Sequence, residues 1–353
     1  MTKGKSNINA VFISHYHLDH IGLIDKINKD IPIYIESKSF EIHKLYLDFT
    51  NSHISDNNIK LFELKDKCIF SNDDIKVYAY LTDHSAYNSV MFKVEGDNKT
   101  ILYTGDYRMH GVKKNVFIKN LKEISNVDLL ISEGTNINRL GVSKSEDDIK
   151  EEINEVMKEY NQVLILRSST NFDRLASLVK CSIKNNKKYI LDLFSYNLNK
   201  ITKMVDVDYK KIYVWNPKKY MKKSREFKEK YFSNGDIKGA FSKFSMDIKI
   251  SMLEDIKLLY EKGLLNKCSL IYSMWEGYLE NDDIKNFINE LERMNIKIYN
   301  IHSSGHGGIE AYKVLNDIVK PKKAVIIHTN NKSRNIDYFD NVIYLNNNEY
   351  VDI

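Results

Sequence analysis

The chain has 353 residues, of which 42% are hydrophobic, enough to bury a sizeable core in two domains or in one domain with a large insertion. It contains no run of eighteen apolar residues that would span a membrane and no secretory signal at its start. The 53 lysines and arginines exceed the 48 aspartates and glutamates by 5, which permits a nucleic-acid partner without arguing for one. Three scattered cysteines give no disulfide framework, so we expect a cytoplasmic protein.

The first third of the chain is predicted to form short strands with helices between them. Continuous apolar runs such as NAVFIS indicate buried strands, and the turn EGDNKT is expected to join two strands as a hairpin. The predicted strands lie at 9–14, 31–37 and 127–134 and, as a series, between 60 and 106, and the predicted helices lie at 21–27 and 37–49.

The middle of the chain alternates helix and strand patterns, which is the signature of βαβ units and of a parallel sheet. Helices are predicted at 144–160, 171–186, 247–262 and 281–294, and strands at 162–167, 188–194, 211–215, 268–275 and 297–304. Because the pattern changes near 137–142 and changes back near 297–301, we expect one domain that is interrupted by an insertion. The expected segments are 1–138, the insertion 139–297, and the return 298–353.

The stretch SHYHLDHIGL, residues 14–23, holds four metal-type ligands within six positions: His15, His17, Asp19 and His20. Such ligands suit Zn²⁺ or another borderline divalent metal. The spacing is not that of two ligands on one face of a helix, as in HExxH. A loop after a strand can instead aim His15 and His17 at one ion, while Asp19 and His20 begin a helix and face another. The competing explanation is a set of polar loop residues at a strand end.

Three further candidates end other predicted strands. YLTDHS ends a strand at His84, ILYTGD ends one at Asp106 and AVIIHT ends one at His328. Each of them alone is explained as well by a residue that caps a turn. Together with the first four they make seven ligands, the number that two metal ions need when one carboxylate bridges them.

The HYHLDH motif, followed by a later histidine, the TGD aspartate and a final histidine, resembles the metallo-β-lactamase fold hydrolases over nearly the whole chain. The resemblance implies an αββα core. It further implies that His15, His17 and His84 bind one Zn²⁺, that Asp19, His20 and His328 bind a second, and that Asp106 bridges the two. Mn²⁺ is the alternative metal, and Asp19 is also expected to serve in catalysis.

Two further motifs resemble the β-CASP branch of these hydrolases, which includes ribonuclease J. ISEGTN places Glu133 at a strand end, and IHSSGHGG places His306 in a glycine-rich turn on the other side of the insertion. The resemblance implies that Glu133 and His306 pair and that His306 is the general acid for the leaving oxygen, a role in which a carboxylate keeps an imidazole charged. A histidine at position 328 favours RNA over DNA as the substrate.

Candidate phosphate contacts come from two segments. The resemblance implies that Ser304 and Gly305, with His306, hold a substrate phosphate at a helix start; the alternative is a tight turn that needs glycine. SSTNFDRL also resembles the branch and supplies Ser169 and Arg174. The alternative there is a helix N-cap at Ser169, Thr170 or Asn171 with Arg174 in a salt bridge.

The segment 216–232, rich in lysine and aromatic residues, is either a groove for single-stranded RNA or, more simply, a solvated helix face. Only fourteen residues precede His15, and one strand fits among them, whereas members of the fold carry several strands there. We therefore expect an N-terminally short core that is destabilised, or that pairs as a homodimer or with a partner supplying strands, with reduced metal affinity.

We conclude from the sequence that the chain is an α/β metallo-hydrolase with an inserted β-CASP α/β domain, acting on RNA in the cytoplasm. Two alternatives stay open. The same core in other proteins cleaves small phosphodiesters, lactones or thioesters, although the insertion and the pair of Glu133 and His306 argue against that. A non-hydrolytic RNA-binding subunit would follow if the short start abolished activity.

Overall fold

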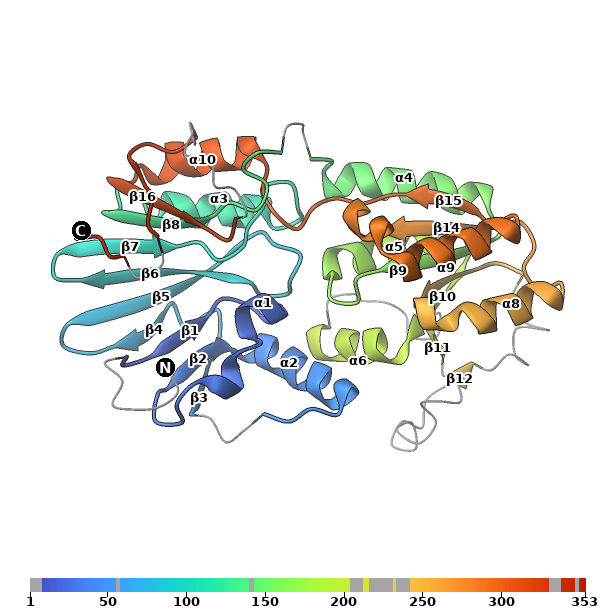
Figure 1. Cartoon of the computed structure of the whole chain (residues 1–353), viewed down its shortest axis with the longest axis horizontal. Helices are drawn as coiled ribbons and strands as arrows, with labels where there is room; N and C mark the ends of the chain where they lie inside the picture. The colour runs from blue at the N-terminus through green and yellow to red at the C-terminus, as the bar shows by residue number, and fades with distance from the viewer. Residues whose placement is uncertain are drawn as a thin grey trace. The chain divides into compact units, whose positions relative to one another are not determined.

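The computed structural model describes residues 8–54, 58–139, 143–203, 212–215, 231–232, 242–329, 338–346 and 349–353. The chain forms two compact units, Met1–Ser143 with Ser304–Ile353 and the inserted Lys144–Ser303 (Figure 1). Both junctions fall a few residues after the boundaries expected from the sequence. The two ends of the inserted unit lie side by side, because Ser303 Oγ donates a 2.6 Å hydrogen bond to the backbone oxygen of Lys144.

The first unit begins with a small parallel sheet in the order β1-β2-β3, with Ile13 of β1 opposite Ile35 of β2. These strands are β1 (Val11–Ile13), β2 (Ile33–Glu36) and β3 (Ile59–Phe62), and the helices beside them are α1 (Leu18–Ile21) and α2 (Ser37–Thr50). The helix expected at 21–27 is instead α1 followed by a short 3-10 turn at Ile24–Lys26. Gly22, a poor helix former, lies between the two pieces.

A seven-stranded sheet in the order β17-β16-β8-β7-β6-β5-β4 forms the rest of this unit. Its strands are β4 (Cys68–Ser71), β5 (Ile75–Leu81), β6 (Val90–Gly96), β7 (Lys99–Tyr103), β8 (Leu129–Glu133), β16 (Lys323–Ile327) and β17 (Val342–Ile343). The predicted hairpin joins β6 to β7 through Asp97 and Asn98, both of which have positive φ, as a two-residue type I′ turn requires. Because β6 runs against both of its neighbours, β5, β7, β8 and β16 share one direction and end at one edge of the sheet.

The first unit has four layers. Phe12 of β1 packs against Phe70 and Phe92, with ring centroids 5.8 and 5.7 Å apart, so the two sheets lie face to face. The outer face of the small sheet is covered by α1 and α2, and the outer face of the large sheet by α3 (Lys114–Lys122) and α10 (Ile309–Val319) (Figure 1). This arrangement confirms the expected α/β sandwich.

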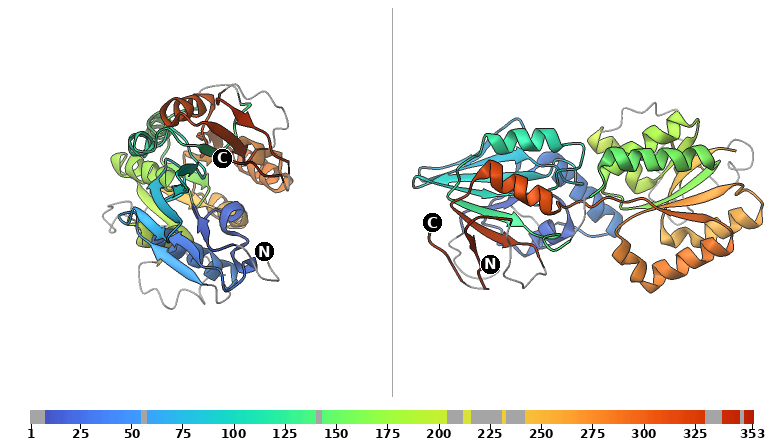
Figure 2. Two further views of the ribbon diagram at one scale, coloured as in Figure 1. Left: turned by 90° about the vertical axis from the view of Figure 1, so that its left-hand side faces the viewer. Right: turned by 90° about the horizontal axis from the view of Figure 1, so that it is seen from above.

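The inserted unit is built on one parallel sheet in the order β12-β11-β10-β13-β9-β14-β15. Its strands are β9 (Gln162–Arg167), β10 (Lys188–Asp192), β11 (Ile212–Trp215), β12 (Tyr231–Phe232), β13 (Phe244–Ile248), β14 (Cys268–Ser273) and β15 (Lys297–Asn300). Its helices include α4 (Glu146–Glu159), α5 (Phe172–Lys184), α6 (Leu193–Thr202), α8 (Leu253–Glu261) and α9 (Asp282–Arg293). Figure 2 shows the green helices and the orange helices on opposite faces of this sheet, in which the central strands β9, β13 and β14 are buried along their whole length.

The sequence did not predict β13, although all five of its residues are buried in the middle of the sheet. FSMDI alternates apolar and polar residues, a pattern typical of a half-buried strand, and its serine and aspartate argue against a strand buried on both faces. Most of the lysine-rich segment 216–232 lies outside the described residues. Within the described part of the chain, no helix is both long and apolar enough to cross a bilayer.

A buried ion pair ties the central strands of the inserted unit together. Asp247 of β13 accepts hydrogen bonds from Arg167 of β9 at 2.5 and 3.1 Å and from the hydroxyl of Tyr189 at 2.6 Å. Burial lowers the pKa of Arg167, but the carboxylate of Asp247 more than offsets this, so the guanidinium stays charged. Asp247, whose polarity argued against a buried strand at this position, is therefore the counter-charge of Arg167 on the neighbouring strand.

We expect Asp247→Ala to destabilise the inserted unit by about 3–5 kcal/mol, because it leaves a buried guanidinium without its counter-charge. Both tryptophans of the chain, Trp215 and Trp275, belong to this unit, so urea unfolding followed by tryptophan fluorescence measures the change. Glu155→Ala, which breaks the exposed pair with Lys158, is the control and is expected to cost less than about 1 kcal/mol. Equal stability of Asp247→Ala and wild type would contradict the argument.

His43 is a second buried polar group, on the inner face of α2. Its side chain is 3% exposed, and neither ring nitrogen has a hydrogen-bond partner among the described residues. Burial lowers the pKa of His43 below the ordinary value of 6.5, and the carboxylate of Asp25 opposes this only in part. The folded protein therefore holds a neutral imidazole that the unfolded chain protonates more readily.

His43 should make the fold sensitive to acid. Because the folded pKa is lower than the unfolded one, its contribution to stability is complete above about pH 6.5 and falls below it, by at most about 1.4 kcal/mol per pH unit. We expect His43→Leu to lose less free energy of unfolding than wild type between pH 7.5 and 5.5, in urea titrations followed by circular dichroism. His53→Leu, at an exposed position, should follow wild type, and parallel curves for all three proteins would refute the explanation.

Candidate metal centre

The seven predicted ligands meet at one edge of the first unit because their strands end there. His15 and His17 follow β1, and Asp19 and His20 lie on the single turn of α1. The other three, His84, Asp106 and His328, follow β5, β7 and β16 respectively. Since these three strands run in one direction, their carboxyl ends deliver the side chains to the same place.

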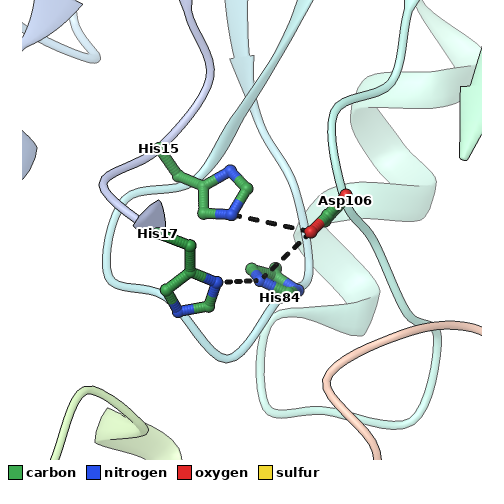
Figure 3. A group of neighbouring side chains, drawn as sticks. All are labelled: His15, His17, His84 and Asp106. Atoms are coloured by element: carbon green, nitrogen blue, oxygen red, sulfur yellow. Dashed lines mark hydrogen bonds and ion pairs between the residues drawn. The ribbon is translucent and has the colours of Figure 1, made fainter. Parts of the chain in front are cut away.

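A first group contains His15, His17, His84 and Asp106, whose side chains point toward one another in Figure 3. His17 Nδ1 lies 3.2 Å from His84 Nε2, and Asp106 Oδ2 lies 3.6 Å from His15 Nε2 and 3.9 Å from His84 Nε2. Ligands bound at 2.0–2.1 Å to one tetrahedral Zn²⁺ are about 3.3 Å apart. The spacing of these donors therefore suits one metal ion.

A second group contains Asp19, His20, His328 and again Asp106. His20 Nε2 lies 3.1 Å from Asp106 Oδ2, and His328 Nε2 lies 3.1 Å from Asp19 Oδ2. The second oxygen of Asp106 lies 3.7 Å from His328 Nδ1. Asp106 thus belongs to both groups, as a bridging carboxylate must.

The protonation of the three histidines of the first group also fits a metal, whereas the hydrogen bond with Asp19 raises the pKa of His328 to about 9. Burial lowers the pKa of His15 and His84 well below the usual range, and lowers that of His17 to about 4. Metals bind the neutral imidazole, so these rings are ready to coordinate. Within the described residues, the buried atoms His15 Nε2 and Asp106 Oδ1 have no hydrogen-bond partner, which a bound cation would provide.

Outer contacts fix how two of these rings face the centre. His84 Nδ1 lies 2.6 Å from the backbone oxygen of Gly305, which can only accept, so Nδ1 carries the proton and Nε2 keeps a free lone pair. Ser14 Oγ lies 3.1 Å from His15 Nδ1 and leaves its Nε2 facing Asp106. Contacts of this kind orient metal-binding histidines in other proteins.

Glu133 and His306 lie beside the second group. His306 Nδ1 is 3.5 Å from Glu133 Oε1 and 3.8 Å from Asp106 Oδ2. The other oxygen of Glu133 accepts a 2.8 Å hydrogen bond from the backbone nitrogen of Thr135. Burial opposes a charge on His306, but the Glu133 carboxylate outweighs it and raises the pKa of His306. The Glu133 carboxylate therefore favours the charged form of the ring.

The loop that carries His306 is held by three side chains. Arg108 Nη1 and His110 Nε2 donate to the backbone oxygen of Ser304, at 3.2 and 2.9 Å. The Asn136 amide donates to Ser304 Oγ at 3.1 Å and to the backbone oxygen of His306 at 3.3 Å. No sequence motif singles out Arg108 or Asn136. Their partners in this loop are backbone oxygens and a hydroxyl group, and sequence patterns do not reveal such contacts.

The candidate phosphate contacts belong to two different units of the chain. Ser304 and Gly305 lie in the loop described above, whereas Ser169 and Arg174 belong to the inserted unit. The structure contradicts a phosphate contact by Arg174, which is fully buried against the carboxylate of Glu146, with Nη to Oε distances of 3.2 and 3.4 Å. Asn171 caps α5, so the salt bridge and N-cap alternative describes this segment. Ser169 Oγ instead accepts a hydrogen bond from Lys249.

Comparison with known proteins points the same way as the geometry. A family described as the beta-lactamase superfamily domain matches residues 2–157. The chain is similar to ribonuclease J of Mycoplasma genitalium, at 23% identity over 93% of this chain and 58% of that protein. It is 22% identical to ribonuclease J of Helicobacter pylori over 92% of this chain and 48% of that protein, and 22% identical to ribonuclease J2 of Bacillus subtilis over 91% and 58%. The chain thus spans about half the length of these relatives.

A solved structure shares the fold. A protein of unknown function from Enterococcus faecalis V583 aligns with a TM-score of 0.77 at 17% identity, over 98% of this chain and 81% of that one. The four-layer fold and the histidine and aspartate cluster agree with the match of residues 2–157 to the beta-lactamase superfamily domain. Over nine-tenths of its length the chain is similar to proteins named ribonuclease J.

Asp106 should control all metal binding, since both groups of donors include it. We expect Asp106→Ala to abolish metal retention, whereas His17→Ala removes only the metal that the first group holds. Elemental analysis of gel-filtered protein after incubation with Zn²⁺ measures the difference, with circular dichroism to verify folding. Full metal retention by Asp106→Ala would show that the carboxylate does not bridge.

Proposed function

We propose that this chain is a zinc-dependent ribonuclease that hydrolyses RNA phosphodiester bonds with water activated by two metal ions. The observation that carries the proposal is the carboxylate of Asp106 between two groups of metal donors, with the Glu133 and His306 pair next to it. The relatives named ribonuclease J supply the choice of RNA as the substrate.

His15, His17 and His84 would hold one ion, Asp19, His20 and His328 the other, and Asp106 both. Two such ions supply a hydroxide nucleophile near neutral pH and neutralise charge on the phosphodiester. Zn²⁺ is the proposed metal, because histidine nitrogen and carboxylate oxygen are its usual ligands, with Mn²⁺ as the alternative. In this role Asp19 also orients the second group through its 3.1 Å contact with His328.

His306 is proposed to protonate the leaving oxygen. The charged imidazole is favoured because Glu133 Oε1 faces its Nδ1, while Glu133 itself is held by the backbone of Thr135. A positioned acid of this kind contributes about 10²–10⁴-fold to the rate. After donating its proton, the ring is recharged from solvent, to which its side chain is 23% exposed.

Ser304 and Gly305 are proposed to bind a phosphate group of the substrate beside the metal centre. Ser304 Oγ already accepts hydrogen bonds from Asn136 and from the backbone nitrogen of His306, so its own proton is free for a phosphate oxygen. Gly305 leaves little room for a side chain, since a Cβ there would lie 2.8 Å from Ser85 Oγ. A contact of Ser169 with RNA, and the cytoplasmic location, stay predictions.

Single-stranded RNA is the proposed substrate, and the alternatives predict different behaviour. The Glu133 and His306 pair argues against a thioester hydrolase, because a thiolate leaves without an acid aimed at it, whereas assays on lactones and small phosphodiesters separate those substrates from RNA. A non-hydrolytic RNA-binding subunit would bind RNA without turnover even when loaded with metal. Assays with 5′-monophosphorylated, 5′-triphosphorylated and circular RNA separate an exonuclease that needs a 5′ end from an endonuclease that cleaves circles.

We expect His306→Ala to lower kcat on RNA by about 10²–10⁴-fold while the zinc content stays that of wild type. Glu133→Gln should reduce kcat in the same direction, because the neutral amide no longer favours the imidazolium. His53→Ala, at an exposed position, is the matched control and should retain full activity. Loss of zinc from His306→Ala would make this residue a ligand, and an undiminished kcat would remove it from the reaction.

A further inference from the structure

Thr135 links two residues of the centre, although no motif singled it out. Its backbone nitrogen donates to Glu133 Oε2 at 2.8 Å. Its hydroxyl lies 2.9 Å from His328 Nδ1 and 3.3 Å from the backbone oxygen of the same residue. One side chain thus contacts both the ring and the main chain of His328.

The hydroxyl contacts favour a proton on Nδ1 of His328. A carbonyl oxygen can only accept, so the single proton of the Thr135 hydroxyl goes to the backbone oxygen of His328. Toward Nδ1 the hydroxyl is then an acceptor, and Nδ1 must carry a proton. Nε2, which lies 3.1 Å from Asp19 Oδ2, is left as the nitrogen that a metal shared with Asp19 can use.

The backbone of His328 needs this support. Its φ is +52°, in the left-handed region that residues with a side chain rarely adopt. The turn of Thr135 can reach it because Glu133 and Ile327 are paired at the ends of β8 and β16, and Gly134 donates to the backbone oxygen of Ile327 at 2.9 Å. A Cβ on Gly134 would lie 2.5 Å from Ile326 Cγ2, so only glycine lets the turn pass this close.

We propose that Thr135 is the positioning residue of His328, holding its backbone in the left-handed conformation and presenting Nε2 to the metal that Asp19 shares. The inference rests on the proposed metal centre but not on RNA cleavage. Removing the hydroxyl frees the ring to rotate or to change tautomer, which weakens this metal and leaves the ion of His15, His17 and His84 in place.

The test is a zinc titration in competition with a chromophoric chelator, on wild type, Thr135→Val and Thr135→Ser. Valine keeps the branched shape without the hydroxyl, whereas serine keeps the hydroxyl. We expect Thr135→Val to weaken one of two zinc sites by about 10–100-fold, the range for loss of an outer hydrogen bond to a ligand. The other site should be unchanged, Thr135→Ser should keep both affinities, and the metal-free proteins should melt together.

Asn136→Ala is the matched control, because Asn136 lies in the same turn and contacts Ser304 and the backbone of His306 rather than His328. The zinc site that Thr135→Val weakens should keep its wild-type affinity in Asn136→Ala. Equal affinities for wild type and Thr135→Val, or equal weakening in Asn136→Ala, would overturn the role of Thr135. If wild type binds no zinc at all, both the proposed metal centre and the role of Thr135 are wrong. If it binds zinc tightly but does not cleave RNA, the ribonuclease proposal fails and the role of Thr135 stands.

Discussion

The carboxylate of Asp106 is the group on which the whole centre depends. Five histidine rings, those of His15, His20, His84, His306 and His328, have a nitrogen within 3.9 Å of its two oxygens. Burial favours a neutral carboxyl group, yet the hydrogen bond from His20 and the charge of neighbouring rings lower the pKa of Asp106. The buried carboxylate therefore stabilises the charged forms of the neighbouring rings of His306 and His328, and its loss would leave these two charges without that counter-charge.

The position of this carboxylate follows from the chain around it. Gly105 has a φ of +56°, and a Cβ there would lie 3.0 Å from both Ser14 and the backbone oxygen of Val90. The chain can turn after β7 this close to β1 and β6 only without a side chain. The glycine of the TGD motif thus sets the distance between Asp106 and the loop of the first histidines.

Sequence reasoning singled out seven candidate ligands that the structure brings together in two groups. Each metal-type ligand follows an apolar strand, so the strand pattern and the residue type suffice to predict it. Thr135 and Asn136 act instead on a backbone oxygen, a hydroxyl and one ring nitrogen, and these partners become neighbours only when β8 and β16 pair. The phosphate contact predicted for Arg174 was wrong for a related reason. Its carboxylate partner, Glu146, becomes its neighbour only when α4 packs against α5.

The hydrogen bond between Ser303 and Lys144 has a consequence for how such a protein changes over evolutionary time. The first and last residues of the inserted unit are joined by one hydrogen bond, so the unit connects to the first unit as a very short loop would. The entropic cost of closing this connection therefore depends little on the size of the insertion. The insertion can therefore be enlarged, reduced or exchanged while the metal ligands keep their places. Glu133 and His306, which flank the insertion in the sequence, stay paired in the host whichever module is carried between them.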